Sequence, residues 1–247
     1  PTRDHTERML RAFGALVEQR GRAVRVHPGA LSSPGELQLP GDVSSAVFWM
    51  VGASCIPGSS IELRDVGLNP SRIHVIDVLR RMGAAIDVQL ALGEAWEPRG
   101  TVTVRAAGLR GVSIEAEEVP LMVDELPAVM VAAACARGQT RLAGLAELRV
   151  KETDRVSSML QGLQSLGVRI ELAGEHDILI QGPTDARAGT ADSDGDHRTA
   201  MSLMLAGLAW GVSGAVVRGV ECVAKSYPEF FDQLRELSGA AVVEERA

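Results

Sequence analysis

An internal repeat of about 75 residues constrains what this chain of 247 residues can fold into. Three segments that are apolar on nearly every side begin at Ser44, Leu126 and His197, and each continues through a glycine-containing turn into a β-branched stretch. A helix that is apolar all round has to be buried. We therefore predict three buried helices, one in each repeat.

Helical patterns that are apolar on one side only alternate with these segments, and each runs through a glycine into a short β-like stretch. The four patterns begin at Met9, Val78, Met159 and Gln233. The glycines that fit their C-terminal caps, in the left-handed conformation, are Gly14, Gly83, Gly167 and Gly239. The sequence thus predicts an amphipathic helix in each repeat and one before the first repeat.

Each repeat reads as a strand, a buried helix, a strand, an amphipathic helix and two further strands. The units extend near 37–108, 110–183 and 186–247, and 1–36 looks like the second half of an earlier unit. Alternating strands and helices also suit an ordinary parallel sheet. The doubled strands favour mixed sheets around a central helical core, so we expect an α/β (α+β) fold of three βαβαββ units.

The composition narrows the class of protein. A net charge of −7 disfavours nonspecific binding to nucleic acid, which relies on a basic surface. Cys55, Cys135 and Cys222 lie far apart among small apolar residues, which predicts free thiols in a reducing compartment. The sequence shows neither a Cys/His cluster with metal-ligand spacing nor an apolar run that could span a bilayer. We expect a cytoplasmic protein that binds no metal, nucleic acid or membrane.

An acidic residue stands close to the start of each buried helix: Asp42, Asp124 and Asp196. Aspartate is a favoured N-cap residue, because its carboxylate accepts hydrogen bonds from free backbone N–H groups of the first turn. We expect capping for at least two of the three. Pro127 fits the first turn of the second buried helix.

Cations gather where the amphipathic helices begin, most densely in the stretch RVKETDR at 149–155. They are Arg72 in the first unit, Lys151 and Arg155 in the second, and Lys225 in the third. A positive charge at a helix N-terminus opposes the helix dipole unless an anion lies between them. Together with Arg198, these repeated positions indicate a shared phosphate or carboxylate ligand. A salt-bridged surface network is the alternative.

Asp124 and Glu152 each adjoin apolar sequence and lie near these cations in the repeat. Neighbouring cations keep a carboxylate ionised, which suits a general base, whereas burial raises its pKa, which suits an acid. The sequence leaves both roles open. The structural alternatives are capping for Asp124 and, for Glu152, an ion pair with Arg155 along one helix face.

Five motifs make this sequence similar to a known enzyme family. They are LPGDVSSAVFWMVGA, VDELPAVMVAAA, ELRVKETDR, DHRTAM and AKSYPEFF, and TRDHTERMLRAFG precedes them. Together they resemble the 5-enolpyruvylshikimate-3-phosphate synthase family from Thr2 to about Leu237. The resemblance implies transfer of the enolpyruvyl group of phosphoenolpyruvate to the 5-hydroxyl of shikimate 3-phosphate, with release of phosphate and without a metal or organic cofactor. That reaction belongs to aromatic amino-acid biosynthesis.

The resemblance also implies a fold and a set of residue roles. Family members have two lobes of three such units, each lobe an inside-out α/β barrel, that close on the substrates. Asp124 would contact the shikimate ring hydroxyls and act as a base toward the 5-hydroxyl, and Glu152 would take part in proton transfer near the methylene carbon of phosphoenolpyruvate. The implied substrate-binding residues are Arg155, Arg198 and Lys225 for phosphoenolpyruvate, Lys151 for the 3-phosphate, Thr2 at a phosphate-contacting position, and His197 beside Arg198.

The chain departs from the family pattern because the first lobe is almost entirely absent, together with the N-terminal strand and its substrate-binding lysine and arginine. We therefore expect 1–38 to be the C-terminal part of the other lobe. Residues 39–247 would form the three-unit lobe without its N-terminal strand. The start at Pro1 rather than Met also suggests an incomplete polypeptide.

The missing lobe leaves several interpretations open. The chain would be a proteolytic product, an engineered half, or one part of a split enzyme, active only with a complementary N-terminal-half chain. A related enolpyruvyl transferase that acts on a UDP-sugar is a second interpretation. A non-catalytic lobe that binds a ligand or a partner is the third.

Overall fold

The computed structural model of the chain describes residues 3–92 and 96–239. The helices are α1 His5–Ala12, α2 Val43–Cys55, α3 His74–Arg81, α4 Leu126–Cys135, α5 Arg155–Ser165, α6 His197–Ala209 and α7 Phe230–Ser238. The strands are β1 Val17–Arg20, β2 Ala23–Val26, β3 Ser60–Gly67, β4 Ala85–Leu90, β5 Arg99–Arg105, β6 Ser113–Ile114, β7 Gly138–Leu142, β8 Arg169–Leu172, β9 Ile178–Gly182, β10 Thr190–Asp192 and β11 Val216–Arg218. Within the described ranges, each helix is too short or too polar to cross a membrane.

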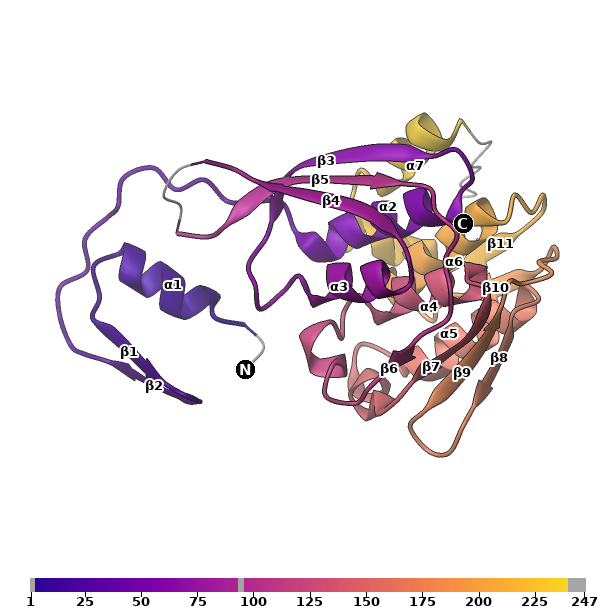
Figure 1. The fold of residues 1–247 in the computed structure, drawn as a ribbon, viewed down its shortest axis with the longest axis horizontal. Coiled ribbons are helices and arrows are strands. Elements are labelled where there is room, and N and C mark those ends of the chain that lie inside the picture. Colours follow the sequence, from indigo (N-terminus) through magenta and orange to yellow (C-terminus); the bar gives the residue numbers. More distant parts are fainter. Residues whose placement is uncertain (1–2, 93–95, 240–247) are drawn as a thin grey trace.

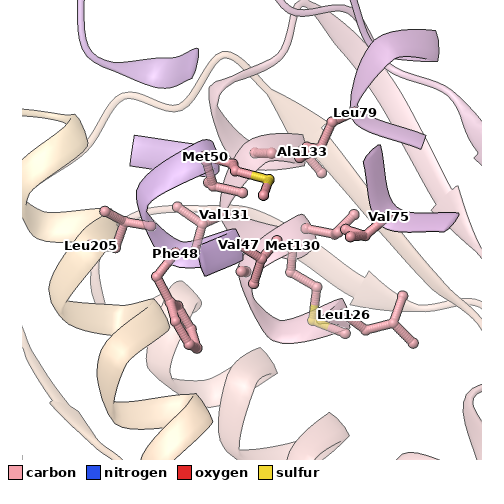
Figure 2. Close-up of a cluster of buried hydrophobic side chains, with 14 of the residues drawn as sticks. Val47, Phe48, Met50, Val75, Leu79, Leu126, Met130, Val131, Ala133 and Leu205 are labelled. Atoms are coloured by element: carbon pink, nitrogen blue, oxygen red, sulfur yellow. The ribbon is translucent and has the colours of Figure 1, made fainter. Parts of the chain in front are cut away.

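Helices α2, α4 and α6 form the centre of the fold (Figure 1). They contact one another, and nearly every side chain of α2 and α4 is buried. Figure 2 shows Phe48 of α2, Met130 of α4 and Leu205 of α6 in one apolar cluster, and burial of such surface is the main favourable term in folding. The prediction of three buried helices is confirmed: the first begins one residue early, at Val43, and the others begin as predicted.

The strands form several small sheets around these helices instead of one parallel sheet. The order is β3-β5-β4 in one sheet and β6-β7-β9-β8 in another, and strands β5 and β9 pair antiparallel with both of their neighbours. β6 pairs parallel with β7, β10 pairs parallel with β11, and a parallel bridge joins Gly41 to Val66. In every unit, the segment before the buried helix therefore pairs parallel with the strand that follows that helix. The mixed βαβαββ order is confirmed in the second unit, and in the first unit a single bridge at Gly41 replaces the opening strand. The strands predicted after Gly239 lie outside the described residues.

Helices α3, α5 and α7 follow the buried helices in the three units, as predicted, and each ends at a glycine. Gly83, Gly167 and Gly239 have φ values of 97°, 95° and 61°, and Gly14 after α1 has a φ of 84°. Side chains with a Cβ rarely adopt this left-handed conformation, so glycine ends the helix there at little cost. The four predicted helix ends are therefore confirmed.

The segment that precedes residue 39 lies to one side of the helical core (Figure 1). Helix α1 has no buried residue, and β2 is exposed along its whole length. Polar contacts connect the segment to the rest of the fold: Asn69 Nδ2 donates to Asp4 Oδ1 at 2.7 Å, and His5 Nδ1 lies 2.6 Å from Glu97 Oε1. The proposed division of the chain at 38/39 stays a prediction.

Candidate active site

Asp124 lies where charged side chains from three segments meet. Its Oδ2 accepts a hydrogen bond from Arg3 Nη2 at 2.7 Å, and its Oδ1 accepts one from Arg155 Nη1 at 3.3 Å. Arg198 Nη2 lies 3.8 Å from Oδ2, and Arg198 Nη1 donates to the backbone oxygen of Asp124 at 3.3 Å. Guanidinium groups from the N-terminal segment, α5 and α6 thus surround a single carboxylate.

Arg155, the first residue of α5, links that carboxylate to two others. Its side chain is only 1% exposed, yet each of its nitrogens has a carboxylate partner. Nε donates to Asp196 Oδ2 at 2.8 Å and Nη2 donates to Glu152 Oε2 at 2.6 Å, while Nη1 reaches Asp124. A buried charge is tolerated only when it is paired and hydrogen-bonded, so the three carboxylates fix the orientation of Arg155.

The start of α6 explains how one of these carboxylates is held. Asp196 is the N-cap of α6, and its Oδ1 accepts hydrogen bonds from the backbone N–H groups of Arg198 at 2.8 Å and Thr199 at 3.0 Å. Its Oδ2 remains for Arg155. A single buried aspartate therefore both caps a helix and orients an arginine of the site.

The capping prediction is confirmed for two of the three aspartates. Besides Asp196, Asp42 caps α2 by accepting from the backbone N–H of Ser44 at 3.0 Å. Asp124 is not a cap, because Glu125 occupies the N-cap position of α4 and makes no side-chain capping bond. The Asp124 carboxylate is therefore available to the arginines, and the structural alternative proposed for it is wrong.

Opposing effects set the pKa of the Asp124 carboxyl. Burial raises this pKa, but the arginines Arg198, Arg3 and Arg155 lower it by more. The net result is a fall in the pKa from 3.8 to about 2. Asp124 is therefore ionised at neutral pH, which the sequence alone left open. The pKa of His197 is lowered by burial and by the charge of Arg198, so its imidazole is predominantly neutral at pH 7.

A cavity of about 260 Å³ opens beside Asp124. Its lining residues are Arg3, His5, Asp42, Ser44, Arg72, Asp124 and Arg198. Glu125, fully buried next to this wall, accepts hydrogen bonds from Ser44 Oγ and, at 3.2 Å, from Arg72 Nη2. Burial raises the pKa of Glu125, and Arg72 and Ser44 offset part of that rise. The cavity wall is thus rich in arginine and backed by a buried carboxyl group.

Glu152 lies in the loop before α5. Its ion pair with Arg155 therefore does not run along one helix face, and that part of the prediction is wrong. The ion pair with Arg155 does form, at 2.6 Å, but it closes the turn that leads into the helix. The Glu152 side chain is 55% exposed. This carboxylate is consequently accessible from solvent while one of its oxygens is held by a buried arginine.

The two lysines are not gathered with the arginines around Asp124. Lys151 Nζ lies 2.9 Å from Glu147 Oε1. Lys225 ends the 3₁₀ helix Val220–Lys225, is exposed, and forms no ion pair with any residue that the structure describes. Thr2 lies outside the described residues. The structure therefore brings together Asp124, Glu152, Arg155 and Arg198, with His197 adjacent.

Sequence reasoning missed Arg3 and Glu125. Arg3 stands beside Thr2 in the motif TRDHTE, and Glu125 is the second residue of the acidic doublet in VDELP. The doublet was the only local signal for Glu125, and it did not reveal which of its two carboxyls faces the cavity. Because Arg3 is distant from Asp124 in sequence, only the fold shows their contact.

The arrangement supports chemistry on anions. Among the residues described, His, Cys, Asp and Glu side chains form no group suited to a metal ion. An ionised carboxylate can accept a proton or a hydrogen bond, and fixed guanidinium groups can hold phosphate or carboxylate oxygens. A second cavity, between α2, α6 and α7, has no ionisable side chain among its described lining residues, so we do not assign chemistry to it.

Comparisons with known proteins show which family this chain is similar to. A family profile described as EPSP synthase (3-phosphoshikimate 1-carboxyvinyltransferase) matches residues 1–234. The 3-phosphoshikimate 1-carboxyvinyltransferase of Desulfitobacterium hafniense is 42% identical over 237 residues, covering 96% of this chain and 54% of that protein. The enzyme of the same name from Roseiflexus castenholzii is 44% identical over 238 residues, covering 95% and 55%.

Solved structures give the same result. The EPSP synthase from Acinetobacter baumannii has a TM-score of 0.89 and 40% identity, covering 96% of this chain and 55% of that one. The enolpyruvyl transferase NikO from Streptomyces tendae is similar in fold alone, with a TM-score of 0.67 and 23% identity over 92% of this chain. The chain spans about half the length of the curated relatives it matches. By its family match and its similarity to these relatives, the chain belongs to the EPSP synthase (3-phosphoshikimate 1-carboxyvinyltransferase) family.

Proposed function

We propose that this chain provides one lobe of an enzyme that transfers the enolpyruvyl group of phosphoenolpyruvate to the 5-hydroxyl of shikimate 3-phosphate and releases phosphate. The observation that carries the proposal is the ionised Asp124 carboxylate, surrounded by arginines at the wall of a cavity. Both substrates are anions, and bringing them together against their repulsion requires fixed cations. The relatives named above are 3-phosphoshikimate 1-carboxyvinyltransferases.

In the proposed reaction, the 5-hydroxyl oxygen loses its proton and bonds to the carbon of phosphoenolpyruvate that carries the phosphate, while the neighbouring methylene carbon gains a proton. The bond from the phosphate-bearing carbon to the phosphate oxygen then breaks, the new methyl group loses a proton to restore the double bond, and the proton taken from the hydroxyl leaves with phosphate. We assign removal of the hydroxyl proton to Asp124 and proton transfer at the methylene carbon to Glu152. Their positions support this division, because they bond to neighbouring nitrogens, Nη1 and Nη2, of the single buried Arg155. That shared partner keeps the two carboxylates close together.

We assign the binding of phosphoenolpyruvate to Arg155, Arg198 and Lys225. Arg155 already uses all three nitrogens for carboxylates, so its main contribution is to place Asp124 and Glu152. Arg198 has looser contacts, and Lys225 has no ion pair within the described chain, which leaves both able to bind an anion.

Three further residues, Lys151, Thr2 and His197, are assigned contacts with the substrates. Lys151 is assigned to the 3-phosphate and would exchange its Glu147 partner for it. Thr2 is assigned to a phosphate contact, although it lies outside the described residues. The neutral imidazole of His197 is assigned a hydrogen bond to substrate beside Arg198.

We further propose that a complementary chain supplies the first lobe, and that 1–38 belongs to that lobe. Helix α1 has no buried residue, and this segment exposes the apolar side chains of Met9, Leu16, Val24 and Val26. Exposed apolar surface of this kind marks an interaction site. The chain's coverage of about half of each relative supports the same partner. The free cysteines support placement of the enzyme in the cytoplasm.

The test is reconstitution. The chain is mixed with a chain carrying the first lobe of a relative, and inorganic phosphate release is followed with phosphoenolpyruvate and shikimate 3-phosphate. We expect release only when both chains and both substrates are present. Arg198→Ala and Lys225→Ala should each lower kcat/KM for phosphoenolpyruvate about tenfold or more, since each removes a charge-assisted contact. Arg198→Lys should rescue only in part, because a point charge replaces a bidentate fork.

Three results contradict the proposal. The first is robust turnover by this chain in the absence of any other protein, since half of the cation set would then be dispensable. The second is phosphate release with a UDP-sugar as acceptor but none with shikimate 3-phosphate. The third is formation of a stable complex of the two chains without any turnover, which favours a non-catalytic binding lobe.

A further inference from the structure

Arg72 is a cation of the cavity wall that the assignments above do not use. It lies in the loop just before α3, and its side chain is 11% exposed. Arg3, Arg198 and Arg72 line the same cavity, so three arginines border one space. A positive charge brought this close to other arginines is costly unless carboxylates or bound anions offset it.

The hydrogen bonds of Arg72 within the described chain use only the Nη2 end of its guanidinium group. Nη2 donates to Ser44 Oγ at 2.6 Å and to Glu125 Oε1 at 3.2 Å. Arginine has five N–H donors, and the N–H groups on Nε and Nη1 make no hydrogen bond within the described chain. The side chain is thus anchored on its buried side and retains donors for a ligand in the cavity.

Glu125 suits the role of an anchor. It is fully buried, and its Oε1 binds both Ser44 and Arg72 while Oε2 has no hydrogen-bond partner in the described chain. A buried ion pair of this kind adds little net stability compared with well-packed apolar residues. Stability therefore does not account for the pair, whereas the need to hold a cation at the cavity wall does.

The repeat gives an independent argument. Each unit has a cation in the segment that leads into its amphipathic helix: Arg72 before α3, Arg155 at the start of α5, and Lys225 before α7. The proposed function assigns anion binding to Lys225, and it assigns to Arg155 mainly the placement of Asp124 and Glu152. Arg72 is the equivalent residue of the first unit, and it lines the cavity that Asp124 and Arg198 also line.

We propose that Arg72 binds an oxyanion of the substrate, a phosphate or carboxylate group, and that Glu125 and Ser44 are positioning residues that hold its guanidinium at the cavity wall. This inference rests on the proposed function, because it takes the cavity to be the substrate site. Phosphoenolpyruvate and shikimate 3-phosphate both offer the required group, so the experiment has to separate them.

The experiment measures anion binding to the full chain by calorimetry, with inorganic phosphate, phosphoenolpyruvate and shikimate 3-phosphate as separate ligands. We expect Arg72→Gln to weaken binding of at least one ligand by about tenfold or more, and Arg72→Lys to recover part of that loss. The ligand that is most affected identifies the oxyanion that Arg72 contacts. Arg64→Gln is the matched control, because it removes the same charge from an 82% exposed side chain of the same unit.

A double variant keeps the test valid if Arg72→Gln unfolds the chain by leaving Glu125 buried without its cation. Arg72→Gln combined with Glu125→Gln removes both charges and leaves a neutral pair that can still hydrogen-bond to Ser44. If Arg72 binds the anion, the folded double variant still binds weakly. If Arg72 only neutralises Glu125, the double variant regains wild-type affinity, and the proposal is overturned.

Kinetics of the reconstituted pair of chains separate this inference from the reaction itself. If anion binding depends on Arg72 but the wild-type pair releases no phosphate, the proposed reaction is rejected and the anion site at Arg72 stands. If the pair turns over and the Arg72 variants leave KM unchanged for both substrates, the proposed reaction stands and the proposed role of Arg72 is overturned. A wild-type chain that binds none of the three anions also overturns it.

Discussion

Replacing Asp124 with Asn removes a negative charge from among three arginines while the size of the side chain stays the same. The fall in the Asp124 pKa from 3.8 to about 2 measures how strongly the folded state favours the ionised form. At about 1.4 kcal/mol per pKa unit, this corresponds to about 2–3 kcal/mol of folding stability at neutral pH. Arg3 is 48% exposed, so solvent screening weakens its share, and we expect a loss of about 1–2 kcal/mol.

The pH dependence provides the sign check for this prediction. A carboxyl group with a lowered pKa stabilises the fold above its unfolded pKa, and the stabilisation is lost as the pH falls through the folded value. The difference between wild type and Asp124→Asn should therefore be constant from about pH 5 to 8 and shrink between about pH 4 and 2.

Urea unfolding of the chain at several pH values measures this difference. Asp77→Asn is the control, because its carboxylate is 64% exposed and its contact with Arg80 is long, at 3.9 Å. We expect the control to change stability by less than about 0.5 kcal/mol. If Asp124→Asn is as stable as wild type at pH 7, or if its deficit persists undiminished at pH 3, the account of Asp124 as an arginine-bound carboxylate is wrong.

Three further variants test other parts of the structure. In the reconstituted enzyme, Glu152→Gln should lower kcat by about 10²–10⁴-fold with little change in melting temperature; near-normal turnover would leave Glu152 only an ion-pair role. For Glu125, whose pKa is raised by burial, the stability of wild type relative to Glu125→Gln should fall as the pH rises from about 4 to 7, and equal differences at both ends would contradict the raised pKa. Tyr227→Phe should cost about 1–2 kcal/mol in thermal unfolding, because the Trp49 indole N–H, which donates to Tyr227 Oη at 2.9 Å, loses its acceptor; an unchanged melting temperature would show that water replaces it.

The fold was predictable because its main signals are local and repeated. The buried helices are apolar on every side, which sets α2, α4 and α6 apart from the amphipathic helices without any knowledge of their partners. Glycine at Gly83 and Gly167 marks helix ends through a conformation that other residues avoid. Doubled strands after the amphipathic helices indicated mixed sheets, and β4 and β8 pair antiparallel with their successors while other strands pair parallel.

The site was predictable only in part, because its contacts join residues far apart in sequence. The motif around Arg155 indicated an anion site, but the burial of Arg155 against Asp196 depends on how α5 and α6 pack. Capping was a reasonable expectation for Asp124, since it stands near a helix start like the other two aspartates. The helix begins at Leu126, as predicted, so Glu125 and not Asp124 takes the N-cap position. The difference of a single residue thus decides which carboxylate contacts Arg3, Arg155 and Arg198.

Asp124 and the substrate anions compete for the same arginines, and this competition links substrate binding to base strength. With Arg3, Arg155 and Arg198 around it, the carboxyl has a pKa of about 2 and is a weak base at neutral pH. A phosphate group bound to Arg198 would offset that charge and raise the Asp124 pKa toward the range in which it can accept a hydroxyl proton. We therefore expect the pKa of Asp124, followed by NMR of its side-chain carboxyl, to rise when phosphate or phosphoenolpyruvate is added, and to rise less in Arg198→Gln. A pKa that is unchanged at saturating anion would show that the anions bind elsewhere, and that the arginines around Asp124 serve only to hold the carboxylate in place.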